Sequence, residues 1–419
     1  MKHALALLLA LSLVLLSGCT VSLSAAGSPD STSSESSSRS VTSSCSLSYA
    51  EDVTPLANEQ DYLLHSFFAR YYDAVGLLES RSYGEFFSDP KQAELAQAWT
   101  DLQVGIRSLQ SLDYSLTDYQ CELLVESVSE QEDGSLRLRV SESSVQHFAC
   151  LPGVDSERFG TMHSFVLEPT ADGWKIRSHS QFDALMSTLF HRYMDALPED
   201  DWDPESFRNL DLTQEYIDAV PGYLEDFAEE MAVRAVSSGS SSLAADQPYD
   251  REAAVAYADA WAELRNDQWE DYTTAGGNCQ NYASQVLYAG EIPMDAQGEY
   301  LWKWYSDVVS NRPGASGRSS SWSGVSQFME YAAGNLGAYG LAAEVDAPYF
   351  SGEPGDLIHM GADGAWRHTV VIVDTISGED GQTADYLVDS NTANLRDYPV
   401  SLYGYPTALL VHIAGWNEG

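Results

Sequence analysis

The stretch from Gly276 to Gly290, GGNCQNYASQVLYAG, decides how the chain is interpreted. Its paired glycines tolerate unusual backbone angles, and the Asn278 that follows them is a residue type that favours the N-cap of a helix. Apolar side chains then recur at the i, i+3, i+4, i+7 spacing of a helix that buries one face. These residues are Cys279, Tyr282, Ala283, Val286 and Leu287. The pattern predicts a buried helix that begins at Cys279.

A cysteine at the first position of a helix has a chemical consequence. The unpaired N–H groups and the helix dipole at that end favour negative charge, so we expect them to lower the thiol pKa and stabilise the thiolate nucleophile. The same N–H groups polarise a carbonyl oxygen under attack. Cys279 is therefore a candidate catalytic nucleophile, and an inert buried cysteine is the alternative.

A thiol hydrolase also needs an imidazole that takes the thiol proton and a polar group that orients the ring. His368 opens the run RHTVVIV at the mouth of a predicted buried strand, and it is the preferred base. His359 is the weaker candidate, and His412, after an apolar run, is predicted to be structural. The next strand ends in Asp389 and Asn391, which lie two residues apart and therefore share a face, so alternation does not choose between them.

These segments together resemble the bacterial family named "Putative amidase domain", which belongs with papain-like thiol hydrolases such as the NlpC-type and CHAP peptidoglycan enzymes. The likeness covers residues 249–419 and rests on the cysteine motif and four later pairs: Ser321-Trp322, Gly355-Asp356, His368-Thr369 and Asn391-Thr392. The resemblance implies a helix packed against an antiparallel sheet. It also implies a catalytic triad, with Cys279 as nucleophile, His368 as base and acid, and Asn391 as the orienting residue.

The chain departs from the family pattern at two positions. Asn278 stands where the family usually has Asp, and Asn391 stands where it usually has His. The lost negative charge makes an imidazolium less stable, which predicts weaker activity. Asp389 is the alternative third member of the triad.

Further residues of the motif are predicted to support the site. Three lie on the cysteine helix, off its apolar stripe, and we expect them to hydrogen-bond the loops around the site, with solvated positions as the alternative: Asn281, Ser284 and Gln285. Trp322 is predicted to line a substrate cleft, with an ordinary core position as the alternative.

The rest of the sequence divides by pattern. Residues 49–190 show helical spacing and then short alternating runs separated by turn signals, which predicts an α+β domain that resembles the cone-shaped NTF2-like fold. Residues 191–247 are predicted to be a helical segment and linker, and 248–419 the amidase-like α+β domain. Cys121 and Cys150 fall in the first domain, where a disulfide and two free thiols are both open.

The N-terminus predicts export. Lys2 and His3 precede an apolar run that ends in LSGC, residues 16–19, which resembles the lipobox of bacterial lipoproteins. We therefore expect residues 1–18 to be a signal peptide, Cys19 to carry lipid that anchors the chain outside the cell membrane, and the Ser-rich residues 19–48 to be a tether. A soluble secreted protein or a retained short anchor is the alternative.

Composition limits the partners. The formal net charge is −42, which argues against a nucleic-acid partner, while 44% hydrophobic residues support a folded core. The sequence has no metal or dinucleotide motif, so we expect no cofactor. It leaves the oligomeric state open.

These observations predict a cell-surface cysteine amidase or peptidase. The expected substrate is a peptide or peptidoglycan-like amide, cleaved through an acyl-enzyme. The alternative is a catalytically weak or inactive papain-like domain that binds a ligand or the cell wall.

Overall fold

The computed structural model describes residues 41–182, 213–235, 239, 241, 243–273, 276–297, 301–304, 318–362 and 364–419. The predicted signal peptide, Cys19 and most of the predicted tether lie outside these residues. The described residues all belong to one compact unit, Ser40–Gly419. None of the helices among them is both long enough and apolar enough to cross a membrane.

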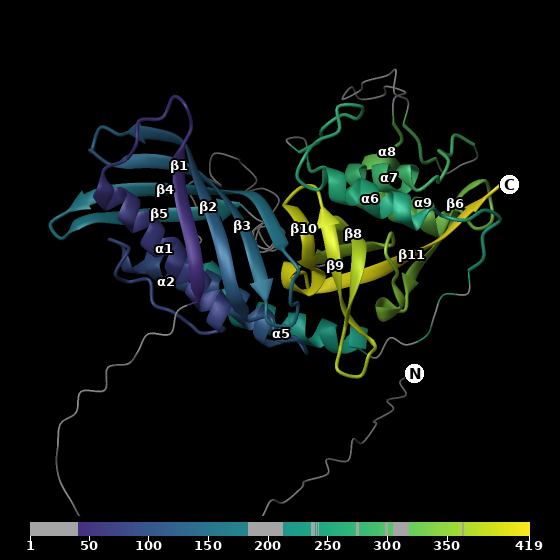
Figure 1. Cartoon of the computed structure of the whole chain (residues 1–419), viewed down its shortest axis with the longest axis horizontal. Helices are drawn as coiled ribbons and strands as arrows, with labels where there is room; N and C mark the ends of the chain where they lie inside the picture. Colours follow the sequence, from purple (N-terminus) through teal and green to yellow (C-terminus); the bar gives the residue numbers. More distant parts are fainter. Residues whose placement is uncertain are drawn as a thin grey trace, which may run out of the picture. The chain divides into compact units, whose positions relative to one another are not determined.

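The fold is mixed α+β, as predicted (Figure 1). The strands are β1 Thr42–Tyr49, β2 Leu116–Glu130, β3 Leu136–Phe148, β4 Ser156–Thr170, β5 Gly173–Phe182, β6 Gly340–Ala347, β7 Leu357–Ala362, β8 Ala365–Ser377, β9 Thr383–Ser390, β10 Asn394–Pro399 and β11 Thr407–Asn417. The helices are α1 Asn58–Leu77, α2 Pro90–Ser108, α5 Thr213–Ala235, α6 Arg251–Trp261, α7 Cys279–Ala289, α8 Ser320–Ser323 and α9 Val325–Gly334, with short 3-10 turns η2 Tyr349–Ser351 and η3 Val400–Tyr403.

Helices α1 and α2 precede the meander of β2–β5, in the predicted order. Helix α2 starts where Asp89 accepts a hydrogen bond from the N–H of Lys91 and where Pro90 fits the first helical turn. Leu64 and Phe68 of α1 are buried in one core with Phe165 of β4. The apolar face of α1 and the inward-facing side chains of the strands therefore pack together in this core.

The predicted tether is wrong at its C-terminal end. Thr42–Tyr49 form β1, which pairs in parallel with β2, and Cys45, Leu47 and Tyr49 are its half-buried residues. The alternation of exposed and half-buried residues that is typical of a strand is therefore present in this segment, although the segment is rich in serine. The register places Cys45, and not Cys150, opposite Cys121. The four cysteines that the structure describes are all free thiols.

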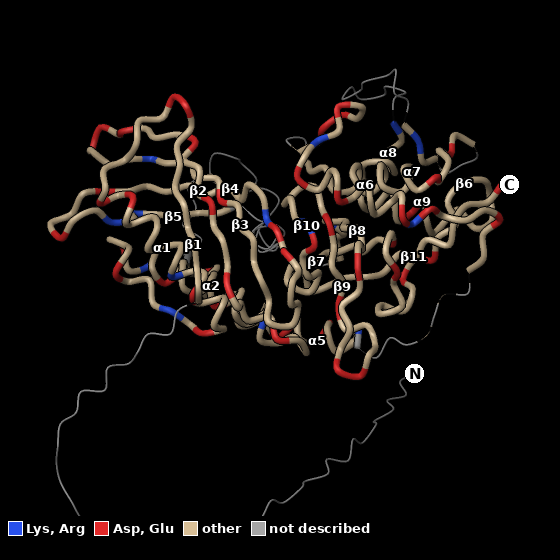
Figure 2. The backbone as a smooth tube through the Cα atoms, in the orientation of Figure 1, with Lys and Arg blue, Asp and Glu red and all other residues tan. Residues whose placement is uncertain are grey.

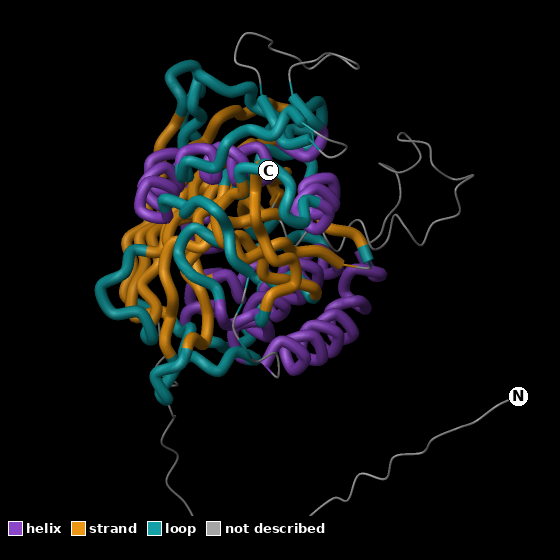
Figure 3. Tube along the Cα trace, turned by 90° about the vertical axis from the view of Figure 1, so that its right-hand side faces the viewer, coloured by secondary structure: helices purple, strands orange, loops and turns teal. Residues whose placement is uncertain are grey.

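The second half of the chain forms the other end of the sheet. In Figure 1, α6–α9 lie above strands β6–β11 and α5 lies below them, and Figure 3 shows helices on both sides of the strands. The sheet runs in the order β1-β2-β3-β4-β10-β9-β8-β7-β11-β6, with β5 on β4. Its antiparallel β6–β11 segment with a packed cysteine helix matches what the family resemblance implied.

The pairing of β4 with β10 joins the two halves. Asn394 lies opposite Phe159 in this antiparallel pair, and the Tyr114 hydroxyl donates to the buried Asp385 carboxylate at 2.5 Å. The sheet therefore continues from the predicted N-terminal domain into the predicted C-terminal domain. Asp and Glu lie along both halves and far outnumber Lys and Arg, as the net charge requires (Figure 2).

We expect Cys45 and Cys121 to form a disulfide when the protein is exposed to oxidised glutathione. The two residues are in register on neighbouring strands, and their thiols hydrogen-bond each other, which lowers the pKa of Cys45. Peptide mass mapping should find these two cysteines linked and Cys150 and Cys279 free. The unfolding free energy should rise by about 2–4 kcal/mol relative to Cys45→Ser under the same oxidant. A Cys121–Cys150 link would contradict the register.

Candidate active site

The first turn of α7 holds the candidate nucleophile. Gly276 and Gly277 have φ values of +107° and +111°, which glycine adopts without strain, and α7 begins at Cys279 as predicted. Asn278 does not cap the helix with its side chain, contrary to expectation. Its backbone N–H instead donates to the Thr392 hydroxyl at 2.6 Å, which fixes the start of α7 to the segment after β9.

The environment of the Cys279 thiol contains two opposing effects. Burial raises its pKa, and backbone N–H groups of Thr369, Gln280 and Cys279 itself act against that by hydrogen-bonding the sulfur. The net direction is upward. The prediction of a lowered thiol pKa is therefore wrong, because desolvation outweighs the helix N-terminus.

His368 lies on β8 directly before Thr369. Its side chain is buried, and its ring packs against Tyr403 and Tyr405 with centroid distances of 5.3 and 6.2 Å. Burial lowers the imidazole pKa to about 4, so the ring is neutral at neutral pH. Its Nε2 atom has no hydrogen-bond partner among the described residues. The structure thus brings Cys279 against the backbone beside His368, without a hydrogen bond between thiol and imidazole.

His359, the weaker candidate, has a structural position. It lies on β7 opposite Thr369, is fully buried, and stacks on Phe328 of α9 at 5.6 Å. Its Nδ1 shares a hydrogen bond of 3.1 Å with the Thr369 hydroxyl, which itself donates to Gln280 at 2.9 Å. His359 is therefore linked to α7 through Thr369, and burial lowers its pKa to about 3.

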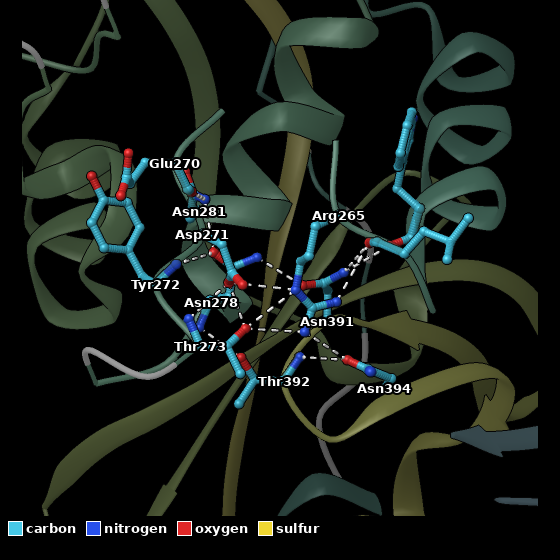
Figure 4. A network of polar contacts seen from close by, with 12 residues as sticks. Arg265, Glu270, Asp271, Tyr272, Thr273, Asn278, Asn281, Asn391, Thr392 and Asn394 are labelled. Carbon is cyan, nitrogen blue, oxygen red and sulfur yellow. Dashed lines mark hydrogen bonds and ion pairs between the residues drawn. The ribbon is translucent and has the colours of Figure 1, made fainter. Parts of the chain in front are cut away.

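Asn391 has partners other than the predicted one. Its side-chain N–H groups donate to the carbonyls of Trp261 at 2.7 Å and Leu264 at 2.9 Å, where α6 ends, and its carbonyl accepts from Asn278 at 2.7 Å (Figure 4). None of its hydrogen bonds reaches His368. The expected orienting role is therefore replaced by another: Asn391 joins the end of α6 to the start of α7.

Asn278 is the centre of the network in Figure 4. Its side-chain oxygen accepts from the backbone N–H of Tyr272 at 3.1 Å and from Asn281 at 2.8 Å, while its N–H donates to Asn391. Asn281 also donates to the Glu270 carbonyl at 2.9 Å. The two positions at which the chain departs from the family pattern, 278 and 391, are therefore in direct contact. A change at either residue therefore alters what the other must donate or accept.

Asn281, Ser284 and Gln285 of α7 form hydrogen bonds with the segments around the helix. Asn281 accepts from the Trp322 indole at 3.0 Å, and Ser284 donates to the Trp322 carbonyl at 2.7 Å. Gln285 accepts from the Tyr257 hydroxyl of α6 at 2.8 Å. All three side chains of α7 are buried, so the solvated alternative is wrong.

Trp322 is a core residue. It is 0% exposed and stacks on Trp302 and Trp269 at centroid distances of 4.7 and 5.2 Å. The expectation that it lines a substrate cleft is therefore not met, and its role is to position Asn281 on α7.

Asp389, the alternative third residue, does not contact His368 either. One carboxylate oxygen accepts the N–H of Asp397 at 2.8 Å, and the other has no hydrogen-bond partner among the described residues. The side chain is 0% exposed, and burial raises its pKa. Asp389 lies instead in a cluster of carboxylates with residues of α6 and β10.

The Gly355-Asp356 pair of the motif is structural. Asp356 is fully buried and accepts from Arg251 at 2.9 Å, from the backbone N–H of Ile413 at 2.9 Å and from His412 Nδ1 at 2.8 Å. The hydrogen bond to Asp356 raises the His412 pKa. The structural role predicted for His412 is therefore confirmed: it ties β11 to the turn before β7.

Sequence reasoning missed the two threonines that touch this first turn. Thr369 contacts the sulfur and Thr392 the backbone of Asn278. Both directly follow a predicted residue in the pairs His368-Thr369 and Asn391-Thr392. The pairs carried the signal, because each threonine directly follows a residue that the sequence analysis had singled out.

Comparisons with known proteins show a similarity for this part of the chain. Residues 248–413 match the model of a family described as "Putative amidase domain". No curated protein and no solved structure matches the chain. The resemblance inferred from the cysteine motif is confirmed for this family, which indicates a hydrolase acting on amides. The papain-like and NTF2-like folds stay predictions.

Asn278→Asp should destabilise the protein by about 1–3 kcal/mol, because a carboxylate would face the Asn391 carbonyl with no hydrogen to donate. Asn391→His alone should cost a similar amount. The double variant should recover part of the loss, since an imidazole N–H donates to a carboxylate. Urea unfolding of the four proteins measures the coupling, and additive losses would show that the two positions are independent.

The His412–Asp356 pair predicts a pH dependence of stability. Because the folded pKa of His412 is raised, its contribution is fully present below the unfolded value of about 6.5 and is lost as pH rises through the folded pKa. His412→Asn keeps a donor but cannot titrate. The wild type should exceed this variant by about 1–2 kcal/mol at low pH, with the difference shrinking at alkaline pH. Parallel urea-unfolding profiles would contradict the assignment.

Proposed function

We propose that residues 248–413 hydrolyse amide bonds with Cys279 as the nucleophile, and that the substrate is cell-wall peptide. The observation that carries the proposal is the position of the Cys279 sulfur. It lies at the first residue of α7 and is hydrogen-bonded by N–H groups from that helix and from Thr369, beside His368. The family match of the same residues supports an amide substrate.

In this reaction His368 is the base. A neutral imidazole accepts a proton, and burial keeps His368 neutral at neutral pH. His368 takes the proton of the Cys279 thiol, and the sulfur attacks the amide carbonyl. N–H groups at the start of α7 stabilise the oxyanion. The protonated imidazole returns its proton to the leaving amine, and water then hydrolyses the thioester.

His368 is preferred over His359 because of exposure and partners. Cys279 and His368 keep 6% and 4% exposure, whereas His359 is 0% exposed and hydrogen-bonds Thr369. The distance between thiol and imidazole shortens in this proposal when substrate binds, as catalytic hydrogen bonds often do. Asn391 acts as a positioning residue for α7 and replaces the orienting role implied by the family.

The location of the activity is a proposal that rests on the sequence alone. A lipid on Cys19 would hold the protein at the outer face of the cell membrane, next to the peptides of the cell wall. The residues concerned lie outside the described part of the chain.

A binding module without turnover is the second candidate. Two observations favour it: the raised pKa of Cys279 and the lack of a thiol–imidazole hydrogen bond among the described residues. Such a domain would hold its ligand with the same residues but release no product.

Incubation of the protein with peptidoglycan separates the two candidates. The amidase proposal expects new amino and carboxyl termini, identified by mass spectrometry, and a loss of at least about 10³-fold in Cys279→Ala and in His368→Ala. Cys150→Ala, which removes another free thiol, should keep full activity.

Two results would overturn the catalytic proposal. One is product formation that survives in Cys279→Ala. The other is binding of peptidoglycan without new termini, together with alkylation of Cys279 no faster than of Cys150 and unaffected by His368→Ala. Full activity of His368→Ala with loss in His359→Ala would move the base to His359.

A further inference from the structure

Three carboxylates outside the proposed catalytic residues converge at one point. Asp259 of α6, Asp389 of β9 and Asp397 of β10 each place an oxygen within 4.8 Å of the others. Asp259 is exposed, Asp397 is half-buried and Asp389 is fully buried. They come from three elements that are distant in the sequence.

The buried member is the informative one. Asp389 is 0% exposed, yet one of its carboxylate oxygens has no hydrogen-bond partner, while the other accepts the backbone N–H of Asp397. No N–H or O–H donor reaches that oxygen, which faces the Asp259 carboxyl group, and two carboxylates in such contact repel each other unless a proton or a cation lies between them. Either a shared proton or a bound cation is therefore needed between these carboxyl groups.

Protein cations do not fill that role. Among the described residues no Lys, Arg or His forms an ion pair with any of the three carboxylates. Arg396 is the nearest candidate, since its charge interacts with Asp389, but its guanidinium is paired with Glu157 of β4 at 2.7 Å. The cluster therefore keeps an excess of negative charge.

We propose that Asp259, Asp389 and Asp397 bind a calcium ion. Oxygen-only carboxylate ligands are those of hard cations, and calcium accepts irregular sets that water completes, whereas magnesium demands near-octahedral geometry. The exposure of Asp259 leaves one side of the site open to that water. The unpartnered Asp389 oxygen then becomes a ligand.

The ion would cross-link the elements behind the proposed active site. Asp259 lies on α6, whose C-terminal carbonyls are held by Asn391, and Asp397 lies on β10, which pairs with β4. A cation here joins α6 to the strands that carry Asn391 and so supports the first turn of α7. The site is structural and does not depend on whether Cys279 is catalytic.

Titration of the calcium-free protein with CaCl2 tests the proposal. Isothermal calorimetry should find one site, and the melting temperature should rise by roughly 2 °C at ten times Kd. Asp389→Asn and the exposed Asp259→Asn should each weaken binding at least about 10-fold. Because Asp259 is on the surface, its variant checks the site even if Asp389→Asn fails to fold.

The high negative charge of the chain makes a diffuse cation effect the main rival. Asp172→Asn, in the exposed turn before β5, removes the same charge at a distant position and should leave calcium binding unchanged. Ionic strength is held constant with NaCl. Equal calcium responses in the wild type and Asp259→Asn, or tighter binding of Mg²⁺ than of Ca²⁺, would overturn the assignment.

Discussion

The contact between the start of α7 and the end of β9 is the constraint on which the second half of the structure depends. Asn278 binds Thr392 through its backbone and Asn391 through its side chain, and Asn391 in turn holds the last carbonyls of α6. Two helices and a strand are thus fixed at one point. Cys279 follows directly, so its sulfur position is set by this network and by the backbone of β8.

The chemistry of the thiol depends on a balance that this arrangement creates. N–H groups directed at the sulfur favour the thiolate, as at any helix N-terminus, but a fully packed environment favours the neutral thiol more strongly. His368 is neutral for the same reason. Because both groups are neutral, the proposed mechanism requires the thiol proton to move from Cys279 to His368 during the reaction.

The family motif proved to encode packing as much as chemistry. Asp356 and Trp322 are fully buried and hold other elements in place, and Asn281 and Ser284 connect α7 to the segments around it. Such residues are recognisable in a sequence because their spacing on a helix is regular. The contacts between them are not, since the Glu270 carbonyl and Trp322 come from other segments of the chain. Sequence pattern alone therefore does not distinguish a motif residue that holds the structure together from one that takes part in catalysis.

The sequence by itself determined the mixed α+β class, the helix that begins at Cys279 and the similarity to the amidase family, because these depend on local spacing of apolar residues and on a contiguous motif. Tertiary structure alone decided the partners of Asn391, the pairing of Cys45 with Cys121, the continuity of β4 with β10 and the meeting of three aspartates. The physical reason is that strand register and side-chain desolvation depend on contacts between segments far apart in the chain, which no local pattern specifies.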